Sequence, residues 1–388
     1  MKRPERFAAG NRIDLIDSGQ GYFEAICAAF SAALHDIFLE SYIFTGDASA
    51  WSVVDALCAA AQRGVAVHVL VDGFGARDMP EPVVVALRAA GAQILVYRKP
   101  VVWRVVRGMR RMHRKLAVAD GAVAFVGGIN IIDDWNTPDE LPPRFDYAVR
   151  IEGPLAADVR AVARHLWRTT TLASLRPRTK TPPMLSPPMA AGTVRAALLV
   201  RDNFLHRTRI EDAYLRAIRA AQSRVLIANG YFLPSAHFFR ALREAARRGV
   251  SVTVILQGPS DHPLMKAATQ SLYRHLIKAG IEIIEYRKSF LHAKVAVIDD
   301  FWATVGSSNI DPFSLMLSRE ANVMIEDQSF AIGLRTSLDA AIAAGGAPVS
   351  ELDLRNFSVL TRLVQWLAYR LARATVDLVA PRGGRTLL

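Results

Sequence analysis

The strongest constraint on the fold of this chain is an internal duplication. The dipeptide Arg63-Gly64 precedes a β-branched run at 66–71, and 185 residues later Arg248-Gly249 precedes a similar run at 251–256. Further matching segments follow at nearly the same spacing. Self-similarity at one long spacing indicates that one ancestral unit occurs twice. A chance match is the alternative, and the number of matching segments argues against it.

Each copy alternates short β-branched runs with helical segments, which is the pattern of an α/β domain whose sheet is covered by helices. The strands expected in the first copy are 12–16, 36–44, 66–71, 93–97, 115–119, 122–126 and 146–151. The second copy repeats this order from about residue 194. We predict an α/β fold of two duplicated domains, each a mixed sheet flanked by helices, related by pseudo-twofold symmetry.

A proline-rich stretch separates the two copies. Five prolines lie between residues 176 and 188, and neither a helix nor a central strand tolerates such a density. The domains expected from this boundary are a first domain at 1–175, a linker at 176–190, a second domain at 191–350 and an amphipathic basic tail at 351–388.

Composition narrows the class of protein and the class of partner. Hydrophobic residues make up 51% of the 388 residues, which excludes a disordered chain and permits a sizeable core. Lysine and arginine (48) exceed aspartate and glutamate (36), giving a net charge of +12. A surface this basic favours nucleic acid or an anionic membrane face as partner. The sequence shows no secretory signal and no convincing transmembrane segment.

The closest approach to a membrane segment is the apolar stretch 356–380. It carries arginines that fall, together with Arg355, within an arc of about 80° on a helical wheel. Leucine and valine, with Trp366 and Tyr369, fill the remainder of the wheel. The pattern predicts an amphipathic helix that lies on a surface. That surface is either a membrane or the protein's own second domain, and the sequence leaves both open.

The residues that carry chemistry form the pattern His-x-Lys-x4-Asp, which occurs once in each copy. The candidate catalytic residues are His113, Lys115 and Asp120 in the first copy and His292, Lys294 and Asp299 in the second. Two residues apart on a strand, histidine and lysine project from the same face. The aspartates fall at the predicted hairpin turns. They are interpreted as scaffold groups, with a direct catalytic role as the alternative.

An asparagine follows each histidine by 17 residues, after a turn of small residues. These are Asn130 in the first copy and Asn309, preceded by Ser307, in the second. The returning strand of the hairpin brings each asparagine back to the level of its histidine. Ammonium and amide donors suit the oxygens of a phosphodiester, so Lys115, Lys294 and these three residues are candidate phosphate ligands.

Two histidines on opposite sides of a phosphodiester suit in-line displacement, because one attacks phosphorus while the other protonates the leaving oxygen. The lysines already supply positive charge, and no zinc, P-loop or dinucleotide signature is present. We therefore expect no metal and no cofactor. A nucleophilic imidazole needs an orienting acid. Glu320 and its repeat counterpart Asp146 are the candidates, with surface acids at strand starts as the alternative.

The doubled motif resembles the phospholipase D superfamily, whose members carry it twice per active site. The chain is most similar to bacterial cardiolipin synthases that lack N-terminal membrane spans, through the stretches 39–44, 229–234 and 292–322. The resemblance implies one active site shared by the two domains and a phosphohistidine intermediate. It favours His113 as nucleophile and His292 as general acid and base, although the symmetry leaves the two roles exchangeable.

The implied reaction is transphosphatidylation between two phosphatidylglycerol molecules, giving cardiolipin and glycerol. The implied setting is the cytoplasmic face of a bacterial inner membrane, with the enzyme bound peripherally to anionic phospholipid. An insertion at 100–111 interleaves apolar residues, Trp103 and arginines, which suggests an interfacial lid rather than a nucleic-acid groove. The alternatives are a phospholipase D-type hydrolase, a phosphodiesterase or nuclease, and a catalytically silent membrane-binding protein.

Overall fold

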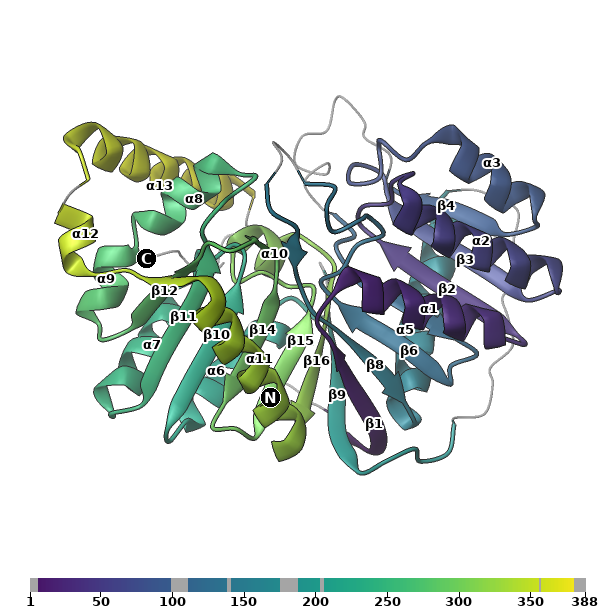
Figure 1. The fold of residues 1–388 in the computed structure, drawn as a ribbon, viewed down its shortest axis with the longest axis horizontal. Coiled ribbons are helices and arrows are strands. Elements are labelled where there is room, and N and C mark those ends of the chain that lie inside the picture. The colour runs from purple at the N-terminus through teal and green to yellow at the C-terminus, as the bar shows by residue number, and fades with distance from the viewer. Residues whose placement is uncertain are drawn as a thin grey trace.

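A computed structural model describes residues 6–98, 111–137, 141–174, 188–202, 206–355 and 357–379. Two similar halves lie side by side, each a twisted sheet with helices on its faces (Figure 1). The first half consists of β1 (Ala8–Ile16), α1 (Gly19–Ala32), β2 (Asp36–Ser41), α2 (Ala48–Gln62), β3 (Ala66–Asp72), α3 (Glu81–Ala89), β4 (Gln93–Tyr97), β5 (Lys115–Ala119), β6 (Val123–Gly127), β7 (Arg144–Phe145), β8 (Ala148–Glu152) and α5 (Pro154–Ala173).

The second half repeats this order and continues past it. Its elements are β9 (Val194–Arg201), α6 (Arg209–Ala220), β10 (Arg224–Asn229), α7 (Ala236–Arg247), β11 (Ser251–Gln257), α8 (Pro263–Gln270), α9 (Tyr273–Lys278), β12 (Glu282–Tyr286), β13 (Phe290–Leu291), β14 (Lys294–Ile298), β15 (Trp302–Gly306), α10 (Pro312–Met316), β16 (Glu320–Glu326), α11 (Gln328–Gly345), β17 (Gly346–Pro348), α12 (Glu351–Arg355) and α13 (Val359–Val379).

The two Arg-Gly dipeptides lie at the ends of equivalent helices. Gly64 after α2 has φ of +93°, and Gly249 after α7 has φ of +88°. In each case the glycine amide and the next amide bond back to the last helical turn, as Val65 N does to the carbonyl of Ala60 at 3.1 Å. This helix-ending motif favours glycine because a Cβ is strained at positive φ. The chain then enters β3 or β11 in the same way in both copies.

The order of the strands shows the pseudo-twofold symmetry directly. It runs β17-β12-β11-β10-β14-β15-β16-β9-β1-β8-β6-β5-β2-β3-β4 and, apart from β17, reads as the same order from either end. Strands β2, β3 and β4 are parallel, whereas β5, β6 and β8 pair antiparallel. The prediction of two duplicated mixed α/β sheets flanked by helices is confirmed.

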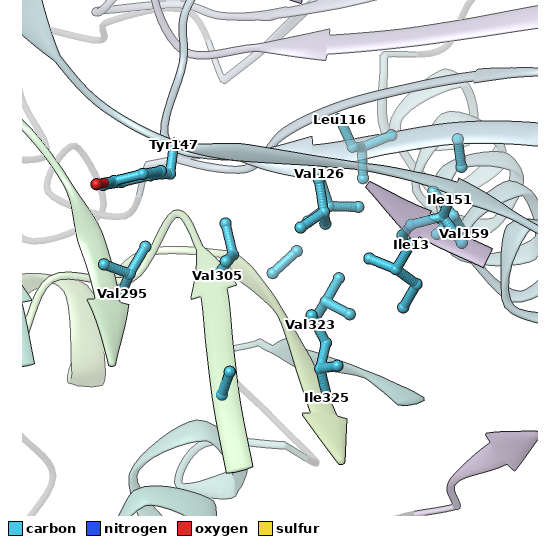
Figure 2. Packing of buried hydrophobic residues seen from close by; sticks show 14 of the residues in the cluster. Ile13, Leu116, Val126, Tyr147, Ile151, Val159, Val295, Val305, Val323 and Ile325 are labelled. Carbon is cyan, nitrogen blue, oxygen red and sulfur yellow. The ribbon is translucent and has the colours of Figure 1, made fainter. Parts of the chain in front are cut away.

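The two halves are held together by a shared hydrophobic core. In Figure 2, Val126 and Ile151 of the first half face Val305 and Val323 of the second, and all four side chains are fully buried. Burying such a side chain contributes about 1.5–3 kcal/mol, so this layer strongly favours one relative orientation of the sheets. Separate cores form on the outer faces, under α1–α3 and under α6 and α7.

Some predicted boundaries differ from the structure or fall outside it. The strand expected at 36–44 ends at Ser41, because the chain turns there and its next residues lie at the end of the sheet. Of the linker predicted at 176–190, only residues 188–190 are among the described residues. Of the insertion at 100–111, only Arg111 is. None of the helices in the described ranges is long and apolar enough to cross a bilayer.

Candidate active site

Each His-x-Lys pair lies at the start of a β-hairpin. Lys115 opens β5 and pairs in register with Gly127, the last residue of β6. Lys294 opens β14 in the same position, where Val295 pairs with Val305 of β15. Asn130 and Asn309 follow the returning strands and are nearly buried. The predicted convergence of histidine, lysine and asparagine at one end of each hairpin therefore follows from the strand register.

The two motif aspartates lie at the opposite end of their hairpins. Asp120 accepts hydrogen bonds from the backbone amides of Leu34, His35 and Asp36, each at 2.8 Å. Asp299 does the same for the amides of 222, 223 and 224, at 2.7, 2.8 and 2.9 Å. A five-residue strand, about 16 Å long, separates each aspartate from the histidine end. The structure therefore places these candidates where they bind backbone amides, at the end of the hairpin away from the histidine and lysine.

Replacing these aspartates should lower stability and spare the chemistry. In Asp120→Asn or Asp299→Asn, one amide oxygen must take over hydrogen bonds that a charged carboxylate accepts, at a cost of about 1–3 kcal/mol of unfolding free energy. We expect urea denaturation to show this loss, while turnover per folded molecule stays within about twofold. Lost turnover with an unchanged unfolding midpoint would restore the aspartates to the catalytic set.

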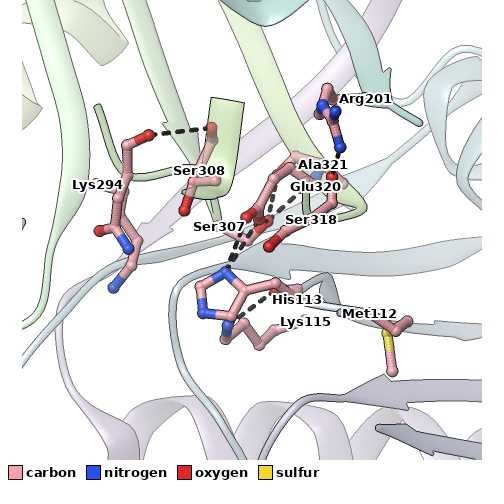
Figure 3. A network of polar contacts seen from close by, with 12 residues as sticks. Met112, His113, Lys115, Arg201, Lys294, Ser307, Ser308, Ser318, Glu320 and Ala321 are labelled. Atoms are coloured by element: carbon pink, nitrogen blue, oxygen red, sulfur yellow. Dashed lines mark hydrogen bonds and ion pairs between the residues drawn. The ribbon is translucent and has the colours of Figure 1, made fainter. Parts of the chain in front are cut away.

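The histidines are oriented by carboxylates of the opposite repeat. His113 Nδ1 lies 3.0 and 3.1 Å from the two carboxylate oxygens of Glu320, and His292 Nδ1 lies 2.6 Å from Oδ2 of Asp146. Figure 3 shows the first pair, with His113 facing Glu320 and Lys115 beside it. Each half thus supplies the histidine of one pair and the acid of the other, so the geometry makes one site from both repeats.

Backbone pairing between the halves explains this exchange. His113 N donates to the carbonyl of Arg319 at 2.9 Å, one residue before Glu320. In the other half, His292 N donates to the carbonyl of Phe145 at 2.9 Å, one residue before Asp146, and β13 pairs with β7. Each histidine therefore lies beside the segment that carries the other repeat's acid. Glu320 begins β16 as expected, whereas Asp146 lies between β7 and β8.

The two lysines are buried beside the histidines. Lys115 Nζ donates to the carbonyl of His113 at 2.8 Å, and Lys294 Nζ donates to that of His292 and lies 3.5 Å from Oδ2 of Asp146. Burial lowers the pKa of both ammonium groups, that of Lys115 to about 7. A bound anion offsets this effect because it stabilises the charged form. The site is therefore prepared to bind negative charge.

The predicted phosphate ligands do not all have free donors. The side-chain oxygen of Asn130 accepts from Ile43 N at 3.0 Å, which leaves its amide NH2 as a donor for an anion. The hydroxyl of Ser307 is fully buried and donates to Glu320 Oε2 at 2.5 Å. Ser307 therefore positions an acid rather than facing a ligand. Its counterpart is Gly128, where a Cβ would overlap the carboxylate of Asp146.

Burial also sets the protonation of the histidines. It lowers the pKa of His113 and lowers that of His292 well below the usual value. Burial raises the pKa of Asp146 to about 6, against the effect of Lys294. At neutral pH the imidazoles are therefore neutral and Asp146 is charged. Nδ1–H then donates to the carboxylate, and Nε2 keeps the lone pair that a nucleophile or base requires.

Tyr42 adjoins the site and was not among the residues predicted from the sequence. The ring of Tyr42, just after β2, lies 4.9 Å from that of His113, with Lys115 Nζ 5.2 Å from its centre. Tyr231 follows β10 one position beyond Gly230, the counterpart of Tyr42, and its hydroxyl donates to Asp261. The duplication gives no signal for Tyr42, because its counterpart in the second repeat is Gly230.

Comparison with known proteins identifies the family of the chain. The family model described as cardiolipin synthase, PLD-like domain, matches residues 26–167 and 214–341. The chain belongs to this family. It is 40% identical to cardiolipin synthase B of Shigella flexneri and 39% identical to that of Escherichia coli K12, in each case over 94% of this chain and 88% of the relative. The resemblance to the phospholipase D superfamily is confirmed.

More distant relatives also match most of the chain. Cardiolipin synthase A of Pseudomonas putida is 31% identical over 94% of this chain and 74% of its own length. Among solved structures, the phosphatidylserine synthase of Haemophilus influenzae superposes with a TM-score of 0.71 over 97% of this chain and 95% of that chain, at 16% identity. At that identity the likeness shows the fold alone, which is the duplicated one described above.

Proposed function

We propose that this protein is a phosphatidyltransferase of the cardiolipin synthase type. It moves a phosphatidyl group from one phosphatidylglycerol to another, which yields cardiolipin and glycerol. The observation that carries the proposal is the pair of crossed histidine–carboxylate contacts, each beside a buried lysine, in a chain 40% identical to cardiolipin synthase B. Such a site provides a nucleophile, a proton donor and anion-binding charge for one phosphodiester.

In the first half-reaction, Nε2 of His113 attacks the phosphorus of the donor lipid. The bond from phosphorus to the glycerol headgroup oxygen breaks, and His292 protonates that oxygen as glycerol leaves. The anionic substrate favours the imidazolium form of His292 that this step needs. Glu320 stabilises the positive charge that develops on His113 as the phosphohistidine forms.

In the second half-reaction, His292 removes the proton from a hydroxyl of the second phosphatidylglycerol. That oxygen attacks phosphorus, the bond to His113 breaks, and cardiolipin is released with both histidines restored. Water can take the place of the acceptor lipid, in which case the product is phosphatidic acid. Transfer therefore depends on the acceptor alcohol outcompeting water.

The phosphate would be held by Lys115, Lys294 and the side-chain amides of Asn130 and Asn309. Their positive charge and N–H donors stabilise the negative oxygens of the transition state without a metal or a cofactor. Ser307 would not contact the phosphate itself, but would position Glu320 through its hydrogen bond to that side chain. Asp120 and Asp299 hold the hairpins that position these residues.

The same proposal places the protein at a membrane. Its substrates reside in anionic bilayers, and a net charge of +12 favours attraction to such a surface. We assign it to the cytoplasmic face of a bacterial inner membrane as a peripheral protein, with anionic phospholipid as its partner rather than nucleic acid. The basic insertion at 100–111 belongs to this proposal as a sequence feature.

The test is product analysis with phosphatidylglycerol vesicles. We expect mass spectrometry to detect cardiolipin and glycerol in equal amounts, and we expect EDTA to leave the rate unchanged because lysines supply the charge. Phosphatidic acid with glycerol as the main products would instead indicate a hydrolase. Cleavage of single-stranded DNA with no lipid turnover would indicate a nuclease, and a divalent-metal requirement would contradict the assignment of Lys115 and Lys294.

A further inference from the structure

Helix α13 covers the second repeat with only one of its faces. Gln365, Ala368 and Ala372 are buried in that contact, and the two alanines belong to the outer core beneath. Gln365 Nε2 also donates to the side-chain oxygen of Gln270 in α8 at 3.3 Å. The helix is therefore fixed on its own domain, which was one of the two surfaces that the sequence left open.

A second face of α13 is apolar and exposed. Its residues are Leu360, Leu363, Val364, Leu367 and Leu371, with exposed fractions between 49% and 69%. At 100° per residue they fall within an arc of about 100°, and the centre of this arc lies about 120° from that of the buried residues. Soluble proteins rarely leave a contiguous apolar stripe of this kind in water, so it indicates a contact with another surface.

Arginines border this stripe and line a cavity beside it. A cavity of about 620 Å³ lies between α8, α9, α12 and α13, and its walls carry Arg274, Arg355, Arg362 and Arg370 against one carboxylate, Glu351. None of these four makes a salt bridge within the described part of the chain. Arg362 donates to the backbone carbonyl of Arg355 at 3.0 Å.

The charge and polarity of this surface together favour an anionic bilayer as the partner that contacts α13. An anionic bilayer offers apolar chains to the leucine stripe and phosphate groups to the arginines within a few ångströms of each other. Trp366, half exposed beneath the guanidinium of Arg370 at 5.5 Å, is a side chain typical of the membrane interface. A protein partner would need carboxylates arranged to match four arginines that have no salt bridge in the described part of the chain.

The position of α13 fits the same occupant. Helix α8 leaves the carboxyl end of β11, and Lys294 pairs with Asn229 at the carboxyl end of the neighbouring β10. The active site and α8 therefore lie at the same edge of the sheet. In Figure 1, α13 lies against α8 along the upper edge of the second repeat. A membrane that contacts α13 is thus on the side from which lipid must reach the histidines.

We propose that α13 is the membrane-docking helix, with its leucine stripe inserted among lipid chains and the arginine-lined cavity binding phospholipid headgroups. The proposal rests on the proposed function, because docking matters only to an enzyme with a lipid substrate. It extends that function by naming the surface that recognises the anionic bilayer and by fixing which face of the protein meets it.

The test compares two variants in vesicle sedimentation. Replacing Leu363, Leu367 and Leu371 with serine should weaken partitioning onto phosphatidylglycerol vesicles at least ~10-fold. Replacing Arg362 and Arg370 with glutamine should reduce the preference for phosphatidylglycerol over phosphatidylcholine vesicles about 10-fold, and this preference should fall with salt. The matched control replaces exposed apolar residues of the first repeat, Leu34, Val85 and Leu172, with serine. It should bind as the wild type does.

A monomeric short-chain phosphatidylglycerol separates docking from chemistry. Both α13 variants should turn it over within about twofold of the wild-type rate, because the stripe lies outside the catalytic residues. Wild-type failure on this substrate would reject the proposed function, whereas the vesicle comparison would still stand. Unchanged vesicle binding by both variants would overturn the docking proposal. A wild-type dimer that dissociates in the leucine variant would also overturn it, since the stripe would then contact a second copy of the chain.

Discussion

His113→Ala and His292→Ala are each expected to reduce turnover of phosphatidylglycerol at least ~10³-fold. The first removes the atom that bonds to phosphorus, and the second removes the proton donor for the leaving oxygen and the base for the acceptor hydroxyl. Each imidazole is buried against a carboxylate of the other repeat, so bulk water cannot readily replace it. Initial rates with vesicles of wild type and variants measure the effect.

An activated substrate then distinguishes the two roles. A phosphodiester with a nitrophenolate leaving group needs no proton donor to break its bond. His292→Ala should therefore release one equivalent of nitrophenol in a burst and stop as a phosphoenzyme, while His113→Ala should show no burst. His206→Ala is the control, because His206 is likewise paired with an aspartate, Asp202 at 2.7 Å, but belongs to neither hairpin. Near-normal turnover by either active-site variant would reject the two-histidine site.

The sequence predicted the fold and the site to the extent that each depends on local pattern. Matched Arg-Gly signals marked equivalent helix ends, and β-branched runs marked β3 and β11. A hairpin has only a few possible registers, so the spacing from Lys115 to the turn at Asp120 sufficed to bring Asn130 back beside His113. The same argument placed the aspartates at the far end of the hairpins.

What the sequence could not provide was the relation between the two halves. The exchange of Glu320 and Asp146 depends on how the inner sheet faces pack, through residues such as Val126 and Val305, which lie 179 positions apart in the sequence. Ser307 resembled a phosphate ligand because the serine hydroxyl commonly donates hydrogen bonds to anions. Only the structure reveals that this hydroxyl is buried and donates to Glu320 instead. The sequence likewise did not show which face of α13 packs on the protein, because that depends on the contact between α13 and α8.

The exchange itself predicts a second large effect. Glu320→Gln and Asp146→Asn should each lower turnover about 10²–10⁴-fold, because an amide can donate toward Nδ1 and favour the wrong tautomer of the histidine. Glu320 raises the pKa of His113 against the effect of burial. Its loss should lower that pKa further, so the acidic limb of the kcat/KM profile should move to lower pH. Glu326→Gln, at the partly exposed far end of the same strand, should leave both rate and profile unchanged.

The burst assay tells which acid serves which histidine. If Glu320 orients the nucleophile His113, Glu320→Gln should slow the burst with the nitrophenolate substrate as well as with lipid. If Asp146 orients the proton donor His292, Asp146→Asn should slow the lipid reaction but leave the nitrophenol burst nearly intact, because that leaving group needs no proton. Pairing within each repeat would reverse this pattern. The two carboxylate variants therefore test whether the shared site is assembled across the pseudo-twofold axis.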